Sequence, residues 1–159
     1  MNTFLNRVEK ILSVAVSAII GLMMLWVFAQ VVTRYVFNYT PSFGEELARY
    51  MFVWVVFLSL PIVAKKGGHM AIEMITVRLK GAALRRVNLI ADAFTLVFLG
   101  IMVWHGIGMV MRASYQTSPA LQISMSWVYL AIPLGCGIML LNVLQHFLSL
   151  LRTGAADQS

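Results

Sequence analysis

The sequence predicts an all-α membrane protein, a single domain over residues 1–159 built as a four-transmembrane-helix bundle. We expect both termini on the cytoplasmic side and a short amphipathic interfacial helix in the cytoplasmic loop between helices 2 and 3. Of the 159 residues, 60% are hydrophobic and 11% are charged, against about 25% charged in soluble domains. Apolar runs at about 11–33, 43–64, 84–111 and 126–151 can each cross a bilayer core, which takes about 20 helical residues.

The distribution of basic residues predicts the topology. Half of the twelve Lys and Arg residues fall between residues 65 and 88, from the end of the second run into the start of the third: Lys65, Lys66, Arg78, Lys80, Arg85 and Arg86. Together with both terminal segments, that side of the membrane holds nine of the twelve, so the positive-inside rule predicts a cytoplasmic location. We expect the six to face the cytoplasm and anionic lipid. They flank apolar spans and form no separate patch, so nucleic acid is not an expected partner.

Aromatic residues give independent support for this topology. All five tyrosines lie in or beside the other two connections: Tyr35, Tyr39, Tyr50, Tyr115 and Tyr129. Tyrosine gathers at membrane–water interfaces because its ring is apolar and its hydroxyl is polar. These two connections are therefore expected at the outer face.

The first two runs read as a hairpin. Residues 2–10 form a polar or amphipathic lead-in, and the run that follows has no small-residue cleavage site after it, which favours a retained signal-anchor helix. Ser42 with Glu45 three residues on is a capping-box pattern that starts the second helix. Pro61 falls near its cytoplasmic end, where a kink is tolerated.

The second half of the chain begins with the predicted interfacial segment, residues 69–80. Glu73, Thr76 and Lys80 share one helical face there, beside an apolar face. A Ser118-Pro119 turn signal separates helices 3 and 4. Small residues in these two helices favour close backbone approach in lipid: Gly100, Gly106, Gly108, Gly135 and Gly137.

A polar cluster at the expected outer interface is the first candidate site. It comprises Arg34, Glu45, Glu46 and Arg49, with Tyr50 beside them. Glu45 and Arg49 are four residues apart with the acid first, the favoured order for an intrahelical pair, and Arg34 could close a network with either acid. One interpretation is that the cluster braces the hairpin or meets a partner subunit. The other is an ion or substrate site, which its shallow position disfavours.

Asp92 is the one acid within the third run, and it lies near the expected cytoplasmic boundary. Pairing with a snorkelling Arg85 is one interpretation, and a proton- or ion-handling role is the other. Haem ligation by His105 and His146 is disfavoured because their depths differ by many turns, and His69 lies in a Gly-rich loop. No Gly-rich phosphate loop, metal-spaced Cys/His set or nucleophile–base pair is present, so neither an enzyme nor a cofactor is expected.

The order of several segments resembles a known family, the small membrane subunit (the DctQ-type or Q subunit) of TRAP transporters, the tripartite ATP-independent periplasmic systems. The segments are Gln30–Asn38, Glu45–Trp54, Gly67–Met70, Pro119–Tyr129 and Pro133–Gly135. Gly44 departs from this pattern, standing where an aromatic residue is expected. Ser124 stands in place of Pro and Glu73 in place of Asp.

The resemblance implies a bacterial inner-membrane, non-catalytic subunit that scaffolds a large M-type subunit. That large subunit would take up an organic acid with sodium, delivered by a periplasmic substrate-binding protein that this chain could contact directly. Two other classes stay open: a self-sufficient exporter acting as a homodimer through Asp92, and the membrane anchor of a redox enzyme. The sequence does not identify the substrate.

Overall fold

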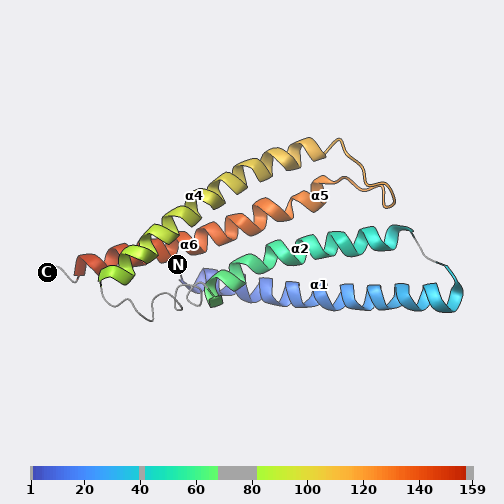
Figure 1. Ribbon diagram of the computed structural model, residues 1–159, viewed down its shortest axis with the longest axis horizontal. Coiled ribbons are helices and arrows are strands. Elements are labelled where there is room, and N and C mark those ends of the chain that lie inside the picture. Colours follow the sequence, from blue (N-terminus) through green and yellow to red (C-terminus); the bar gives the residue numbers. More distant parts are fainter. Residues whose placement is uncertain (1, 40–41, 68–81, 157–159) are drawn as a thin grey trace.

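The structure, a computed structural model, describes residues 2–39, 42–67 and 82–156. It contains α1 (Asn2–Phe37), α2 (Ser42–Gly67), α4 (Ala82–Ala113), the short α5 (Ser126–Tyr129) and α6 (Ala131–Ala156) (Figure 1). Within these described residues, four segments are long and apolar enough to cross a membrane: Arg7–Phe37, Phe43–Ala64, Arg86–Ala113 and Ser126–Leu151. The predicted all-α, four-helix membrane fold is confirmed.

Some predicted features lie outside the described residues. The interfacial segment 69–80, with Arg78 and Lys80, is among them. The same holds for the side chains of Ser42, Lys65, Lys66 and Arg85. The capping box and the positions of these basic side chains therefore remain predictions.

The four helices form a flat layer in which they follow one another in the order α1, α2, α6, α4 (Figure 1). The α1–α2 connection and the α4–α5 connection lie at one end of this layer, which we call the loop end. The starts of α1 and α4 and the end of α6 lie toward the opposite, terminal end (Figure 1). This is the grouping that the charge distribution predicted, while the side that faces the cytoplasm stays a prediction.

The edge helix α1 packs through one narrow stripe. Its less exposed positions recur at alternating spacings of four and three residues, the seam expected when one helix packs along another: Leu12, Val16, Ile19, Met23, Trp26, Gln30 and Thr33. Leu12 and Val16 form a buried cluster with Leu58 of α2, against which Ile138 of α6 also packs. Most of the other described α1 side chains are exposed, apart from Val8, Glu9 and Ala15, which are partly buried.

Two glycines set the distances between helices in the middle of the layer. A Cβ atom at Gly135 would lie 2.2 Å from the carbonyl oxygen of Phe57, so α2 and α6 approach backbone to backbone. A Cβ at Gly106 would lie 3.3 Å from Pro133 Cδ, where α4 meets α6. The predicted role of small residues is confirmed at these two positions. The remaining glycines of the predicted set have no atom within 4 Å of an added Cβ: Gly100, Gly108 and Gly137.

Helix bounds differ from expectation at both ends of the chain. α1 begins at Asn2 and absorbs the predicted lead-in, and it continues to Phe37. The last span is divided into α5 and α6 at Leu130, whose backbone stays helical with φ −61° and ψ −24°. Pro133 explains this division, because it has no N–H to donate to the carbonyl one turn back.

Candidate functional site

Glu46 is the centre of the most connected polar group at the loop end. Its carboxylate accepts hydrogen bonds at Oε2 from the backbone N–H groups of Ala120 and Leu121, both at 3.0 Å. The Tyr50 hydroxyl donates to Oε1 of the same carboxylate. One side chain in the first turns of α2 thus holds the tip of a loop 74 residues further along the chain. We call Glu46, Tyr50, Ser118, Ala120, Leu121 and Met125 the Glu46 cluster.

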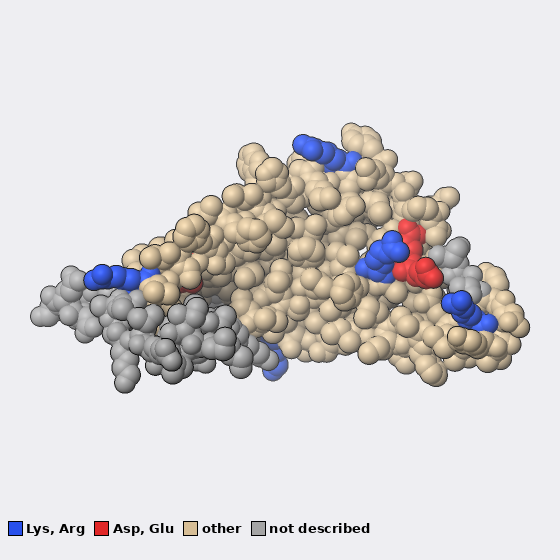
Figure 2. All heavy atoms as spheres, in the orientation of Figure 1, with Lys and Arg blue, Asp and Glu red and all other residues tan. Residues whose placement is uncertain are grey.

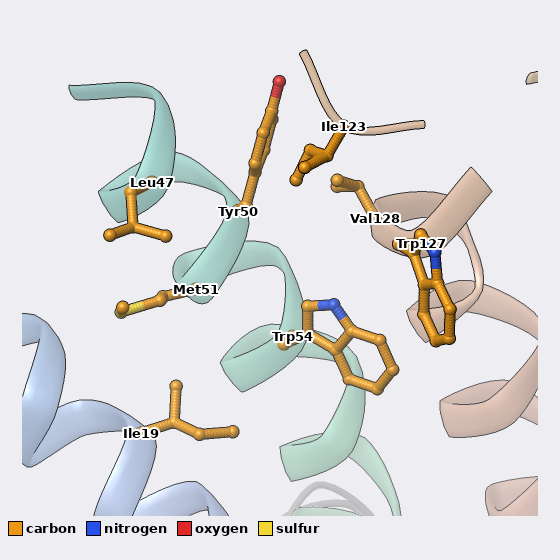
Figure 3. Close-up of a pocket in the computed structure, with 8 residues that line it drawn as sticks. All are labelled: Ile19, Leu47, Tyr50, Met51, Trp54, Ile123, Trp127 and Val128. Carbon is orange, nitrogen blue, oxygen red and sulfur yellow. The ribbon is translucent and has the colours of Figure 1, made fainter. Parts of the chain in front are cut away.

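Tyr50, one helical turn after Glu46 in α2, donates a hydrogen bond to the Glu46 carboxylate. Its side chain is buried, and its hydroxyl lies 3.3 Å from the sulfur of Met125. Figure 3 shows its ring rising from α2 toward the segment that carries Ile123. The ring therefore packs against the connection while its hydroxyl satisfies the carboxylate.

The α4–α5 connection is a tight hairpin that presents its tip to Glu46. The N–H of Ser118 donates to the Ile123 carbonyl and that of Met125 to the Gln116 carbonyl, both at 2.9 Å. Ser118 is 2% exposed, and its hydroxyl accepts from the Leu121 N–H at 3.2 Å. Gln122 takes a left-handed backbone with φ 52°, an uncommon conformation for a residue other than glycine. The turn predicted at Ser118-Pro119 is confirmed.

The ion pairs expected among Arg34, Glu45 and Arg49 do not form in the described parts of the chain. Arg34, Glu45 and Arg49 are exposed, and within the described parts of the chain no ion pair at 4.0 Å or less joins them to one another or to Glu46. Figure 2 shows acidic and basic side chains gathered at this end. Exposed charges gain little by pairing in water, and Glu46 is engaged by backbone amides instead. Glu46 and Tyr50 are therefore the two predicted residues that the structure brings together.

Contacts between α1 and α2 close the other side of the loop end. Trp26 Nε1 donates to the carbonyl of Gly44 at 3.2 Å, and the Trp26 ring lies 5.9 Å from that of Phe43. A Cβ atom at Gly44 would lie 1.8 Å from Gln30 Nε2. The glycine that departs from the family pattern thus makes room for Gln30. Sequence reasoning missed Trp26 and Gln30, although both fall on the regular α1 stripe.

Asp92 has a partner that the sequence analysis did not predict. His146 Nδ1 of α6 lies 2.7 Å from Asp92 Oδ2 of α4, and Asp92 is 9% exposed. Arg85 was the expected partner, and its side chain lies outside the described residues. Asp92 and His146 fall on facing helices near the terminal end, so the pair joins α4 to α6.

A shallow apolar hollow of about 250 Å³ lies between α1, α2 and α5 (Figure 3). Its lining includes Ile19, Tyr50, Trp54, Ile123 and Trp127. No group of three or more His, Cys, Asp or Glu residues placed to hold a metal ion occurs in the described ranges. The hollow therefore offers packing surface rather than polar chemistry.

These features define a class: a multi-pass helical membrane protein in which Glu46 and Asp92 join one segment of the chain to another. Residues 23–153 match the family described as "Tripartite ATP-independent periplasmic transporters, DctQ component". The chain belongs to this family, whose members are membrane subunits of a transporter and not enzymes.

Three curated relatives illustrate the family. The chain is 25% identical over 152 residues to the sialic acid TRAP transporter small permease protein SiaQ of Vibrio cholerae, covering 96% of this chain and 86% of the relative. It is 31% identical over 113 residues to the C4-dicarboxylate small permease protein DctQ of Rhodobacter capsulatus, covering 70% and 50%. It is 32% identical over 116 residues to the isethionate permease protein DctMQ of Oleidesulfovibrio alaskensis, covering 71% of this chain and 18% of that longer protein.

Proposed function

We propose that this chain is the small, non-catalytic subunit that binds a large M-type TRAP permease subunit and scaffolds it in the bacterial inner membrane. The large subunit would carry out sodium-driven uptake of an organic acid delivered by a periplasmic binding protein. Some relatives are far longer permeases of which this chain covers 18% or 24%, which supports a close association between the two kinds of subunit.

One observation carries this proposal: the flat layer leaves its helices largely uncovered. In the four candidate spans, between 6% and 22% of the residues in the most apolar window are buried inside the chain. A protein that moved a solute by itself would need an enclosed polar path, because ions are costly in lipid. A subunit that offers surface to a partner and to lipid needs no such path.

The positions of the intramembrane polar residues favour a scaffold over a self-sufficient exporter. Asp92 is the acid on which an exporter would depend, and it is engaged with His146 between two helices. A carboxylate held in a helix–helix contact suits bracing better than repeated binding and release of an ion. The redox-anchor alternative has no observation in its favour.

The loop end has two parts in this proposal. The Glu46 cluster braces the two connections against each other. Arg34, Glu45 and Arg49 are exposed at the same end and are free to meet the large subunit or the periplasmic binding protein. The basic residues of the α2–α4 connection would face the cytoplasm and anionic lipid.

The relatives' names bear on the substrate class. They specify sialic acid, a C4-dicarboxylate and isethionate, which are all organic anions. We therefore propose an organic anion for the transporter that contains this chain, with selectivity residing in its other subunits.

The proposal is tested by affinity purification of the tagged chain from native membranes in mild detergent, with partners identified by mass spectrometry. Recovery of one large multi-spanning permease is expected. Recovery of the chain alone, or only with a second copy of itself, would overturn the proposal and return attention to Asp92.

A further inference from the structure

The exposed side of α4 carries an ionisable residue at membrane depth. α4 lies at an edge of the layer (Figure 1) and contacts α6 through the side that bears Asp92 and Gly106. Its opposite side forms what we call the α4 ridge: Phe94, Val97, Ile101, Trp104, His105 and Gly108. Phe94 is 74% exposed and Trp104 78%, so nothing in the described chain covers this ridge.

His105 is out of place on a lipid-facing surface. It lies eight residues before the end of α4 at Ala113, which is roughly 12 Å along the helix. The side chain is exposed, and no hydrogen bond or ion pair involves it among the residues that the structure describes. Ionisable side chains within a span almost always face protein or a water-filled cavity and pair there. An imidazole on the α4 ridge therefore indicates a covering protein with a polar group at that depth.

Gly108 lies one turn from His105 on the same side and favours the same conclusion. No atom of the chain lies within 4 Å of a Cβ added there, so contacts inside this subunit do not require glycine. Glycine on an uncovered face of a membrane helix lets a second helix approach closely. The imidazole of His105 and the open space at Gly108, where a second helix could approach, thus lie next to each other on α4.

The other edge of the layer lacks this combination. The exposed side of α1 carries Ser13, Ser17 and Gly21. A serine hydroxyl can bond to the carbonyl one turn back in its own helix, so these serines need no partner in lipid. Between residues 11 and 33 the α1 edge therefore carries no ionisable side chain that needs a partner at membrane depth, although Gly21 leaves room for a second helix there as Gly108 does on α4.

We propose that the α4 ridge is the surface on which a transmembrane helix of the large permease subunit docks, with a polar group of that helix hydrogen-bonded to His105. This inference rests on the proposed function and adds to it the face and the recognition chemistry. Lipid or a second copy of this chain are the occupants against which it is tested.

The test compares matched variants in the affinity purification of the complex. Gly108→Leu and Gly21→Leu are matched variants, because a Cβ atom added at either of these glycines on an edge helix meets no atom within 4 Å. His105→Leu makes the α4 ridge fully apolar. We expect Gly108→Leu and His105→Leu to lower recovery of the large subunit by about tenfold, the factor that 1.4 kcal/mol produces, and Gly21→Leu to leave it unchanged.

A photocrosslinking residue at Trp104, with Phe28 of α1 as the matched exposed control, gives a second readout in intact membranes. Crosslinks from position 104 to the large subunit are expected. Adducts from 104 only to lipid or to a second copy of this chain, or recovery lowered only by Gly21→Leu, would overturn the docking face while leaving the proposed function intact. Failure of the unmodified chain to recover any large subunit would instead overturn the proposed function.

Discussion

At the scale of single residues, the Glu46 carboxylate joins α2 to the α4–α5 connection. It accepts hydrogen bonds from two backbone amides and a tyrosine hydroxyl, whereas the sequence indicates only that Arg34 could close a network with it. A carboxylate can accept several N–H donors at once, so this arrangement fixes the hairpin tip without a basic partner. Glu45, one residue earlier, is exposed and provides a natural comparison.

Glu46→Gln should loosen the hairpin tip. The amide keeps one acceptor oxygen and loses the charge, so it cannot serve both amides and the Tyr50 hydroxyl equally. Hydrogen exchange at the Ala120 and Leu121 amides should accelerate about fivefold to tenfold, measured by mass spectrometry on the protein in detergent. Glu45→Gln should leave exchange unchanged, and equal acceleration in both variants would contradict the bracing role.

The Asp92–His146 pair should contribute to the stability of the α4–α6 contact. Replacing Asp92 by Asn weakens a charge-assisted hydrogen bond between a buried carboxylate and a partly exposed imidazole, so we expect a loss of about 1–3 kcal/mol in the free energy of unfolding. A double-mutant cycle with His146→Gln, measured by denaturant unfolding in detergent, should give a coupling energy of at least about 0.5 kcal/mol. Strictly additive effects would show that the two side chains do not act together.

At the scale of elements, helix number and approximate position were predictable because the length of an apolar run is set by bilayer thickness. Which helices pack against one another was harder to predict. That α6 packs between α2 and α4 in the middle of the layer depends in part on Gly135 meeting the Phe57 carbonyl, residues far apart in the sequence. The Glu46 contacts were unpredictable for the same reason. The groups that bind its carboxylate at the hairpin tip are backbone amides, and the residue types at these positions do not indicate such a contact.

Gly135 and Gly137 allow a test of this packing within one helix. Gly135→Val places a Cβ against the Phe57 backbone, whereas the Cβ of Gly137→Val would meet no atom within 4 Å. The first variant should lose about 1–3 kcal/mol, the usual cost of overpacking, and the second should stay close to wild type. Thermal unfolding in detergent compares the two, and similar midpoints would mean that α2 and α6 do not approach so closely.

At the scale of the whole molecule, the charge distribution predicts the orientation of the layer. Tyr115, at the loop end, is 93% exposed, which makes it a suitable site for a reporter cysteine after replacement of the buried Cys136. The positive-inside rule predicts that a cysteine at position 115 reacts with a membrane-impermeant maleimide from the periplasmic side. Labelling only after the inner membrane is opened would place position 115 on the cytoplasmic side and contradict the predicted topology.

The flat, open arrangement of the helices is consistent with the role of a subunit in a larger transporter. Its surfaces suit a partner and lipid, and Glu46 and Asp92 hold segments of the chain together. Composition and apolar runs alone could not distinguish this layer from a closed bundle, because both need four spans of similar length. The resemblance to TRAP small subunits supplied the function class. The geometry explains how such a chain could act by binding a partner subunit through its exposed helix faces.

The central claim is that this chain contributes surface and not transport chemistry. The most direct measurement is uptake into lipid vesicles of the organic acid carried by the associated binding protein, with this chain alone, the large subunit alone, or both. We expect uptake only when both subunits are present. Uptake by vesicles containing this chain alone would contradict the account.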